Sequence, residues 1–116
     1  METISHKEFK DGKIVYSVPK NAQYEITVQE IPEHKNFTGI CQRAIIDGKS
    51  YPLHDEITFT FKIVDGKVEV VWGWHIGTVD FTFSKEKGDN CEDYIDDYFP
   101  GLLKQLKTKL KEMKYL

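Results

Sequence analysis

The chain has 116 residues, of which 40% are hydrophobic and 13% aromatic, and its formal net charge is -3. This length suits a single domain over residues 1–116, and the apolar content excludes a disordered chain. The slight acidic excess argues against nucleic acid as a partner, because phosphate contacts need clustered basic residues. No apolar run is long enough for a membrane span or a signal peptide, so we expect no membrane contact and a cytoplasmic location.

The first half of the chain is predicted to form strands joined by tight turns. The dipeptide Asp-Gly, followed each time by Lys, occurs at residues 11–13, 47–49 and 65–67. Asp-Gly accepts the positive φ angles of two-residue hairpin turns, so each copy predicts a hairpin. The segments beside these turns that read as strands are 13–18, 23–31 and 38–47, with a short edge strand at 50–53 that tolerates Pro52.

The third Asp-Gly turn also predicts a register. A turn at residues 65 and 66 pairs Ile63 with Val68, Lys62 with Glu69, Phe61 with Val70, Phe59 with Trp72 and Ile57 with Trp74. In this register apolar residues face one another and a lysine faces a glutamate. A four-residue loop at 75–78 would then pair Trp74 with Val79, Trp72 with Phe81 and Val70 with Phe83. We therefore expect one buried face that contains Phe59, Phe61, Val70, Trp72, Phe81 and Phe83.

An amphipathic helical segment is predicted over residues 90–115. From Cys91 onward, apolar residues recur at steps of three and four, at Ile95, Phe99, Leu102, Leu103, Leu106, Leu110 and Met113. Asp89 or Asn90 can cap its start. Pro100 interrupts the pattern, so we expect a short helix followed by a longer one that has Pro100 in its first turn.

These elements predict an α+β fold. Its strands lie within residues 9–84 and form a strongly twisted antiparallel sheet of six or seven strands, a meander or partial barrel. The sheet packs on a C-terminal amphipathic helix that is kinked or broken at Pro100.

Two groups of residues are candidate sites. Trp74 at its strand end, together with His75, His54 and Glu56, is expected to border a pocket. With Asp55, these histidines and carboxylates are of types that bind metals or transfer protons, but they match no metal or catalytic motif. We therefore predict no metal, no cofactor and no catalytic residue, and read Cys41 and Cys91 as reduced thiols without a catalytic role.

The second candidate is the segment 89–98, DNCEDYIDDY, which concentrates negative charge beside two tyrosines. Its acids can complement the helix dipole, or they can dock a protein with a basic surface. The residues assigned to partner binding are Asp93, Tyr94, Asp96, Asp97 and Tyr98.

Two functions remain open. The first is a small cytosolic binding module without catalysis, such as an inhibitor, an immunity-type protein or an adaptor, which acts through protein contact. The second is a small-molecule binder or enzyme with a pocket between the sheet and the C-terminal helix. The missing catalytic signature favours the first.

Overall fold

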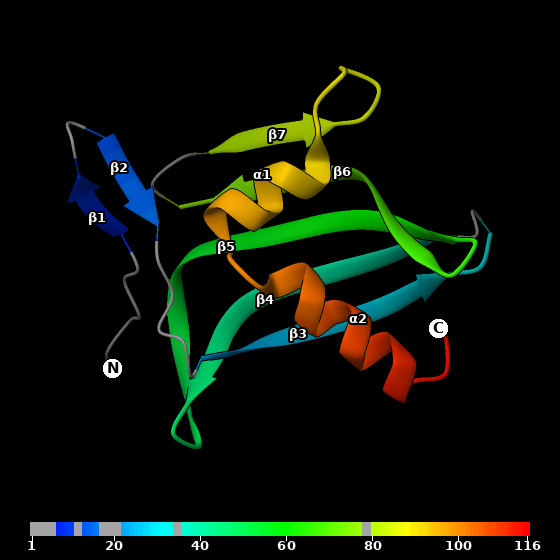
Figure 1. The fold of residues 1–116 in the computed structure, drawn as a ribbon, viewed down its shortest axis with the longest axis horizontal. Helices are drawn as coiled ribbons and strands as arrows, with labels where there is room; N and C mark the ends of the chain where they lie inside the picture. The colour runs from blue at the N-terminus through cyan, green and yellow to red at the C-terminus, as the bar shows by residue number, and fades with distance from the viewer. Residues whose placement is uncertain (1–6, 11–12, 17–21, 34–35, 78–79) are drawn as a thin grey trace.

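The computed structural model describes residues 7–10, 13–16, 22–33, 36–77 and 80–116, which form an α+β fold (Figure 1). Within these residues, five strands form the main antiparallel sheet, in the order β3-β4-β5-β6-β7, and two strands form a separate antiparallel ribbon. The main sheet thus has five strands rather than the expected six or seven. The strands are β1 (Lys7–Lys10), β2 (Lys13–Tyr16), β3 (Gln23–Ile31), β4 (Asn36–Ile46), β5 (Lys49–Val64), β6 (Lys67–Ile76) and β7 (Phe81–Ser84).

Two of the three predicted hairpin turns are confirmed. Asp47 and Gly48 have φ angles of 50° and 80°, and Asp65 and Gly66 have 51° and 72°. Positive φ at both central residues is the signature of the type I′ turns that connect twisted strands. The first predicted turn, at residues 11 and 12, lies outside the described residues, although the flanking strands β1 and β2 pair with each other.

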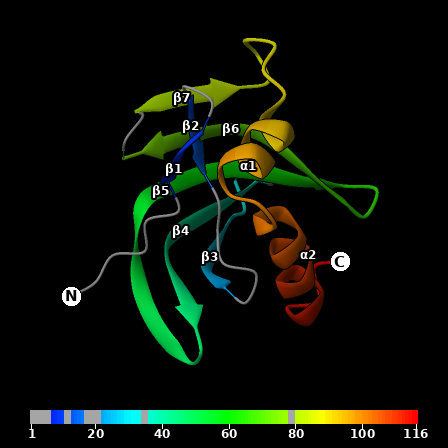
Figure 2. The ribbon, with the colours of Figure 1, turned by 60° about the vertical axis from the view of Figure 1, so that its left-hand side comes forward.

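The predicted short strand at 50–53 is instead the beginning of β5, which is 16 residues long. Pro52 pairs with Arg43 of β4, whereas β6 joins β5 only from Glu56 onward. Pro52 therefore lies on a stretch of β5 that has a strand neighbour on one side, where proline is tolerated. The register of β4 and β5 shifts between Cys41 and Arg43, and both strands are strongly curved (Figure 2).

The C-terminal segment forms two helices, α1 (Cys91–Tyr98) and α2 (Leu102–Glu112). Asn90, one of the two predicted caps, accepts a hydrogen bond from the backbone N–H of Asp93 at 3.1 Å. Pro100 lies between the helices, whereas the prediction put it in the first turn of the second helix. Gly101 precedes α2 with a φ of 83°, a left-handed conformation that glycine adopts without strain.

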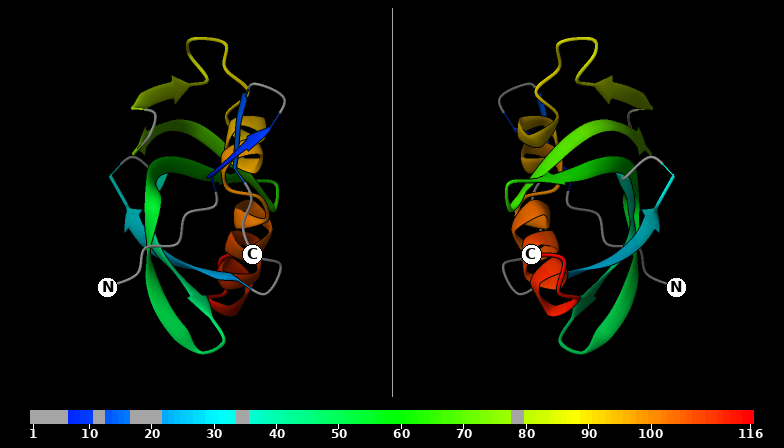
Figure 3. Two further views of the ribbon diagram at one scale, coloured as in Figure 1. Left: turned by 90° about the vertical axis from the view of Figure 1, so that its left-hand side faces the viewer. Right: turned by 90° about the vertical axis from the view of Figure 1, so that its right-hand side faces the viewer.

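Both helices cover the same face of the five-stranded sheet (Figure 3). The core between them includes the predicted residues Phe59, Phe61, Val70 and Phe83, each at most 1% exposed. The helices contribute Ile95, Phe99, Leu102, Leu106 and Leu110, all 0% exposed. The predicted helical stripe is therefore buried, except at Met113, which is exposed.

A β-bulge in β6 makes the second half of the predicted register wrong. Phe61 pairs with Val70 as expected, but Thr60 pairs with Trp72. Val71 is therefore an extra residue that has no cross-strand partner on β5. Beyond this point every residue of β6 faces the side opposite to the one predicted, because side chains alternate between the two faces of a strand. The pairs with β7 change accordingly, with Gly73 opposite Phe83 and Trp72 opposite Ser84.

Candidate functional site

The bulge turns two tryptophans out of the core. Trp72 is 39% exposed and Trp74 is 43% exposed, on the sheet face that the helices do not cover. The prediction that both belong to the buried wall is therefore wrong, and Phe81, which is 40% exposed, is not fully buried either. Gly73 takes the inward position because Phe83 packs against it and leaves no room for a side chain there.

The outer face around these tryptophans carries no charged side chain over two rows that cross all five strands. One row contains Thr27, Ile40, Thr58, Trp74 and Thr82, and the other contains Gln29, Thr38, Thr60, Trp72 and Ser84. Charged residues make up 30% of the whole chain, so this neutral region is distinct in composition. Exposed aromatic side chains on a surface without charge are typical of the centre of a protein interface.

On β5, charged residues border this neutral region on both sides, at Glu56 and at Lys62. Glu56 lies on the outer face at one end and accepts a hydrogen bond from Gln42 at 3.4 Å. Lys62 lies on the same face at the other end, opposite Glu69 of β6, which forms an ion pair with Lys85. The face therefore has a neutral centre, with Glu56 on one side of it and Lys62, next to the pair of Glu69 and Lys85, on the other.

On the inner face, His75 is 0% exposed and packs against α1 rather than lying in a loop. Its Nδ1 is 3.1 Å from the hydroxyl oxygen of Tyr94, and its Nε2 is 3.7 Å from Oδ1 of Asp55. The rings of Tyr98 and Phe99 surround it, with centroids 5.1 and 5.2 Å away. Burial lowers the pKa of His75, although the neighbouring Asp55 carboxylate acts in the opposite direction.

The five residues considered for a pocket or metal site lie on both sides of the sheet. Asp55 Oδ1 lies between two histidines, 3.5 Å from Nδ1 of His54 and 3.7 Å from Nε2 of His75. Glu56 and Trp74 lie on the outer face, away from this buried pair. Among the described residues, no group of three potential ligands is arranged to hold a metal ion.

In the acidic segment of α1, the aspartates and the tyrosines differ in their exposure to solvent. Asp93, Asp96 and Asp97 are exposed, whereas Tyr94 and Tyr98 are half-buried, with ring centroids 4.6 Å apart. Burial and the neighbouring Asp93 raise the pKa of Asp96, because crowded carboxylates disfavour further negative charge. The surface available to a partner here therefore consists mainly of the three carboxylates.

Glu92 in the same helix has a role that the sequence did not indicate. Its Oε1 accepts a hydrogen bond from the backbone N–H of Val70 at 2.9 Å, next to the bulge. A charged acceptor forms a stronger hydrogen bond than a neutral one, so this contact joins α1 firmly to β6. From the sequence, this side chain was included only as part of the acidic segment 89–98.

Another unpredicted arrangement covers the edge of the sheet at β3. The side-chain amide of Gln105 in α2 accepts from the backbone N–H of Tyr24 at 2.8 Å and donates to the carbonyl of Ala22 at 3.3 Å. One turn later, the amine of Lys109 donates to the carbonyl of Ile26. The helix thus supplies the hydrogen bonds that another strand would make, which protects an edge from pairing with other chains. An open groove of about 770 Å³ lies along the same edge.

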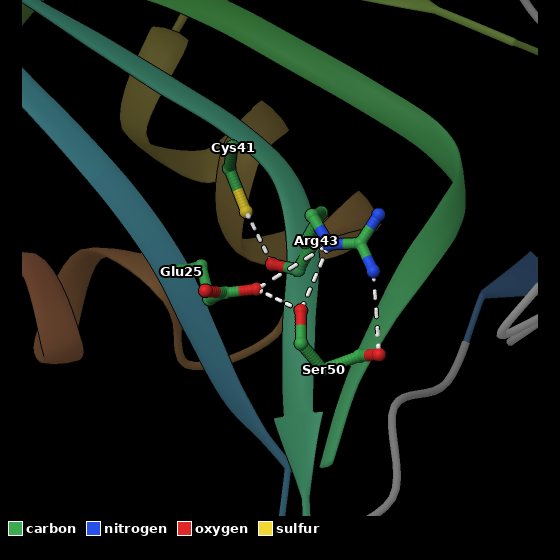
Figure 4. Close-up of polar contacts among 4 residues, drawn as sticks. All are labelled: Glu25, Cys41, Arg43 and Ser50. Atoms are coloured by element: carbon green, nitrogen blue, oxygen red, sulfur yellow. Dashed lines mark hydrogen bonds and ion pairs between the residues drawn. The ribbon is translucent and has the colours of Figure 1, made fainter.

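A polar network crosses β3, β4 and β5 near the turn that joins β4 to β5 (Figure 4). Arg43 donates from Nε to the hydroxyl of Ser50 at 2.8 Å, and its Nε is 3.6 Å from the carboxylate of Glu25. The nearby thiol of Cys41 is buried, and this burial raises its pKa to about 12. The thiol of Cys91 is also buried, with a raised pKa. Neither is therefore a good nucleophile, since thiolate is the reactive form.

Comparison with known proteins gives no assignment: no family model matches the chain, and neither a curated protein nor a solved structure matches it significantly. Within the described residues, neither helix has the length and apolar content needed to cross a membrane.

Proposed function

We propose that this protein is a small non-catalytic binding module that recognises another protein through the outer face of its sheet. The observation that carries the proposal is the exposure of Trp72 and Trp74, at 39% and 43%, in the middle of that face. Tryptophan is among the residues most enriched at binding hot spots, because it offers a large rigid contact area. A fold that needed these rings only for stability would bury them.

The surroundings of the two rings support the same function. Protein interfaces have few charges at their centre and a polar rim, which is the distribution seen between Glu56 and Lys62. The buried position of His75 and Asp55, and the raised pKa values of both thiols, favour a module without catalysis. Inhibitor, immunity-type and adaptor proteins all belong to this class. Two free thiols suit a reducing compartment, so we place its action in the cytoplasm.

The exposed carboxylates of α1 are proposed as a second surface, for a partner with basic side chains. The raised pKa of Asp96 favours this use, because a cation placed beside Asp93 and Asp96 would relieve their mutual repulsion. This surface lies on the helix side of the sheet, away from the tryptophans, so the two surfaces can be tested separately.

Small-molecule binding is the alternative function, and the groove between β3 and α2 is where such a ligand would lie. It is lined by Tyr24, Gln105 and Lys109, and not by the predicted group around Trp74 and His75. Small-molecule pockets normally enclose most of the ligand surface, whereas this groove is open to solvent. The geometry therefore favours the protein-binding function.

The test is capture of proteins from the native host by the immobilised chain. We compare the wild type with a Trp72→Thr/Trp74→Thr variant, which places at both positions a β-branched side chain that suits a strand. The control is Met113→Thr, which removes an exposed apolar side chain from the end of α2. The proposal expects specific capture by the wild type and the control, and none by the double variant. Identical capture by all three folded proteins would disprove a role for the tryptophan face.

A further inference from the structure

The charge pattern on the outer face points to a specific occupant. We propose that the partner bound by the Trp72 and Trp74 face is a second copy of this chain, arranged about a two-fold axis. This inference rests on the proposed binding function and names its partner. It follows from three properties of the face: its neutral centre, the position of its tryptophans and the opposite charges at its ends.

The neutral centre removes the usual obstacle to self-association. In a two-fold interface the same surface patch is used by both copies, so any cluster of one charge meets itself and repels. The two central rows of the face, from Thr27 to Thr82 and from Gln29 to Ser84, contain no charged residue. Two copies can therefore approach without placing like charges at the centre.

The central pair of the face is Phe59 of β5 and Gly73 of β6, which lie opposite each other. Trp72 and Trp74 are the neighbours of Gly73 on either side, and both point outward. A two-fold axis that passes over this pair, perpendicular to the strands, reverses the strand direction in the second copy. Trp72 of each copy then lies over Trp74 of the other, so that each exposed ring meets a ring.

The same axis brings opposite charges together. Glu56 and Lys62 lie three residues before and three residues after Phe59 on the outer face of β5. Reversal of the strand places Lys62 of one copy over Glu56 of the other, and this contact occurs twice. An axis parallel to the strands and lying over β5 would instead set Lys62 against Lys62 and Glu56 against Glu56. A parallel axis between β5 and β6 would set each tryptophan over a threonine instead of over the other tryptophan. The rings and the charges together therefore select the perpendicular axis.

The first measurement is the mass of the purified protein by sedimentation equilibrium over a range of concentrations. We expect a reversible dimer of twice 13.5 kDa. Trp72→Thr should raise the dissociation constant roughly thirtyfold or more, as expected for a hot-spot residue, whereas Met113→Thr should leave it unchanged. A monomer at every accessible concentration would overturn the inference.

The second measurement tests the axis by exchange of charges. Lys62→Glu alone and Glu56→Lys alone each place like charges together twice, so each variant should be monomeric. A mixture of the two variants should form a heterodimer, because the carboxylate introduced in the first variant then meets the amine introduced in the second, and the native pair forms at the other contact. Both substitutions lie on the surface, and circular dichroism checks that each variant is folded. Dimers unaffected by either change, or variants that fail to recover on mixing, would refute this arrangement.

These experiments separate this inference from the proposed function. If the chain is monomeric but the tryptophan variant loses a different captured protein, the binding function stands and the dimer is wrong. If the chain neither dimerises nor captures a protein through this face, both fail.

Discussion

Phe83 packs so closely on Gly73 that a methyl group added to the glycine would lie 2.1 Å from Cζ of the phenylalanine ring. The two residues are opposite each other on β6 and β7. This contact explains why the inner face contains a glycine where the regular register predicted a tryptophan. Space that the Phe83 ring occupies cannot also hold an indole ring.

The variant Gly73→Ala should therefore destabilise the fold, by about 1 to 3 kcal/mol or more, because overpacking forces shifts in the core. Urea unfolding measures the change. Phe83→Leu removes the distal ring atoms, so the double variant should lose less stability than the sum of the two single losses. Strict additivity would show that the Gly73 contact with Phe83 is not the cause.

Deletion of Val71 should remove the bulge but keep both tryptophans outside. After the deletion, Trp72 still follows an inward Val70 and still pairs with Thr60. The deletion removes one hydrogen bond, which the backbone N–H of Lys85 donates to the backbone carbonyl of Val71. The free energy of unfolding should therefore fall by only about 1 to 3 kcal/mol. Acrylamide quenching of tryptophan fluorescence should stay as strong as in the wild type. A blue-shifted, protected emission would mean that the rings had moved inward and that the assigned faces are wrong.

The pairing of β5 with β6 next to their turn was predicted from the sequence, whereas the bulge in β6 was not. Asp65 and Gly66 determine the first pairs through turn geometry, and the match of Phe61 with Val70 is confirmed. A signal of the bulge was present in the adjacent valines 70 and 71, which break the alternation of apolar and polar residues. The small Gly73 between two large side chains was a second signal. Its cause, the ring of Phe83, becomes visible only when the sheet is assembled.

In the helices and the site, too, features that depend on neighbouring residues were predicted, and contacts between residues far apart in the sequence were not. The stripe of α1 and α2 and the cap at Asn90 depend on nearby residues and were predicted. The contacts of Glu92 with Val70 and of Gln105 with Tyr24 join residues 22 and 81 positions apart. No local pattern indicates such pairs, because they depend on where the helices dock.

Acid should destabilise the fold through His75. Its pKa is lowered from 6.5 by burial, so below pH 6.5 the unfolded chain binds a proton that the folded chain does not. The free energy of unfolding should fall as the pH drops from 6.5 towards the lowered pKa. His75→Gln keeps a polar side chain without this titration and should flatten that pH dependence, measured by urea unfolding. The half-exposed His54, changed to Gln, is the control, and an equal flattening in both variants would contradict the assignment to His75.

The acidic surface of α1 is tested by reversing Asp96 and Asp97 to lysine. Both residues lie in the last turn of α1, where the helix dipole favours positive charge, so the change should not destabilise the fold and should add about 0.3 to 1 kcal/mol to its stability for each residue at low salt. If a basic partner docks here, its association should also slow sharply and lose its dependence on salt, because complementary charges steer the encounter. Melting temperature and association rate are measured at two salt concentrations. Glu33→Lys, an exposed acid in another part of the chain, is the control, and unchanged association in the Asp96 and Asp97 variant would exclude this surface.

The cover on the β3 edge has a consequence during synthesis on the ribosome. Tyr24 is made 81 residues before Gln105, and Ile26 is made 83 residues before Lys109. For most of the time the chain takes to emerge, the backbone of β3 therefore lacks the helix that covers it, and nascent chains on neighbouring ribosomes can pair through it. The sheet edge is covered by a helix that is translated long after it, so slow translation or a stall between the sheet and α2 would leave the edge open to aggregation, although the folded protein is protected.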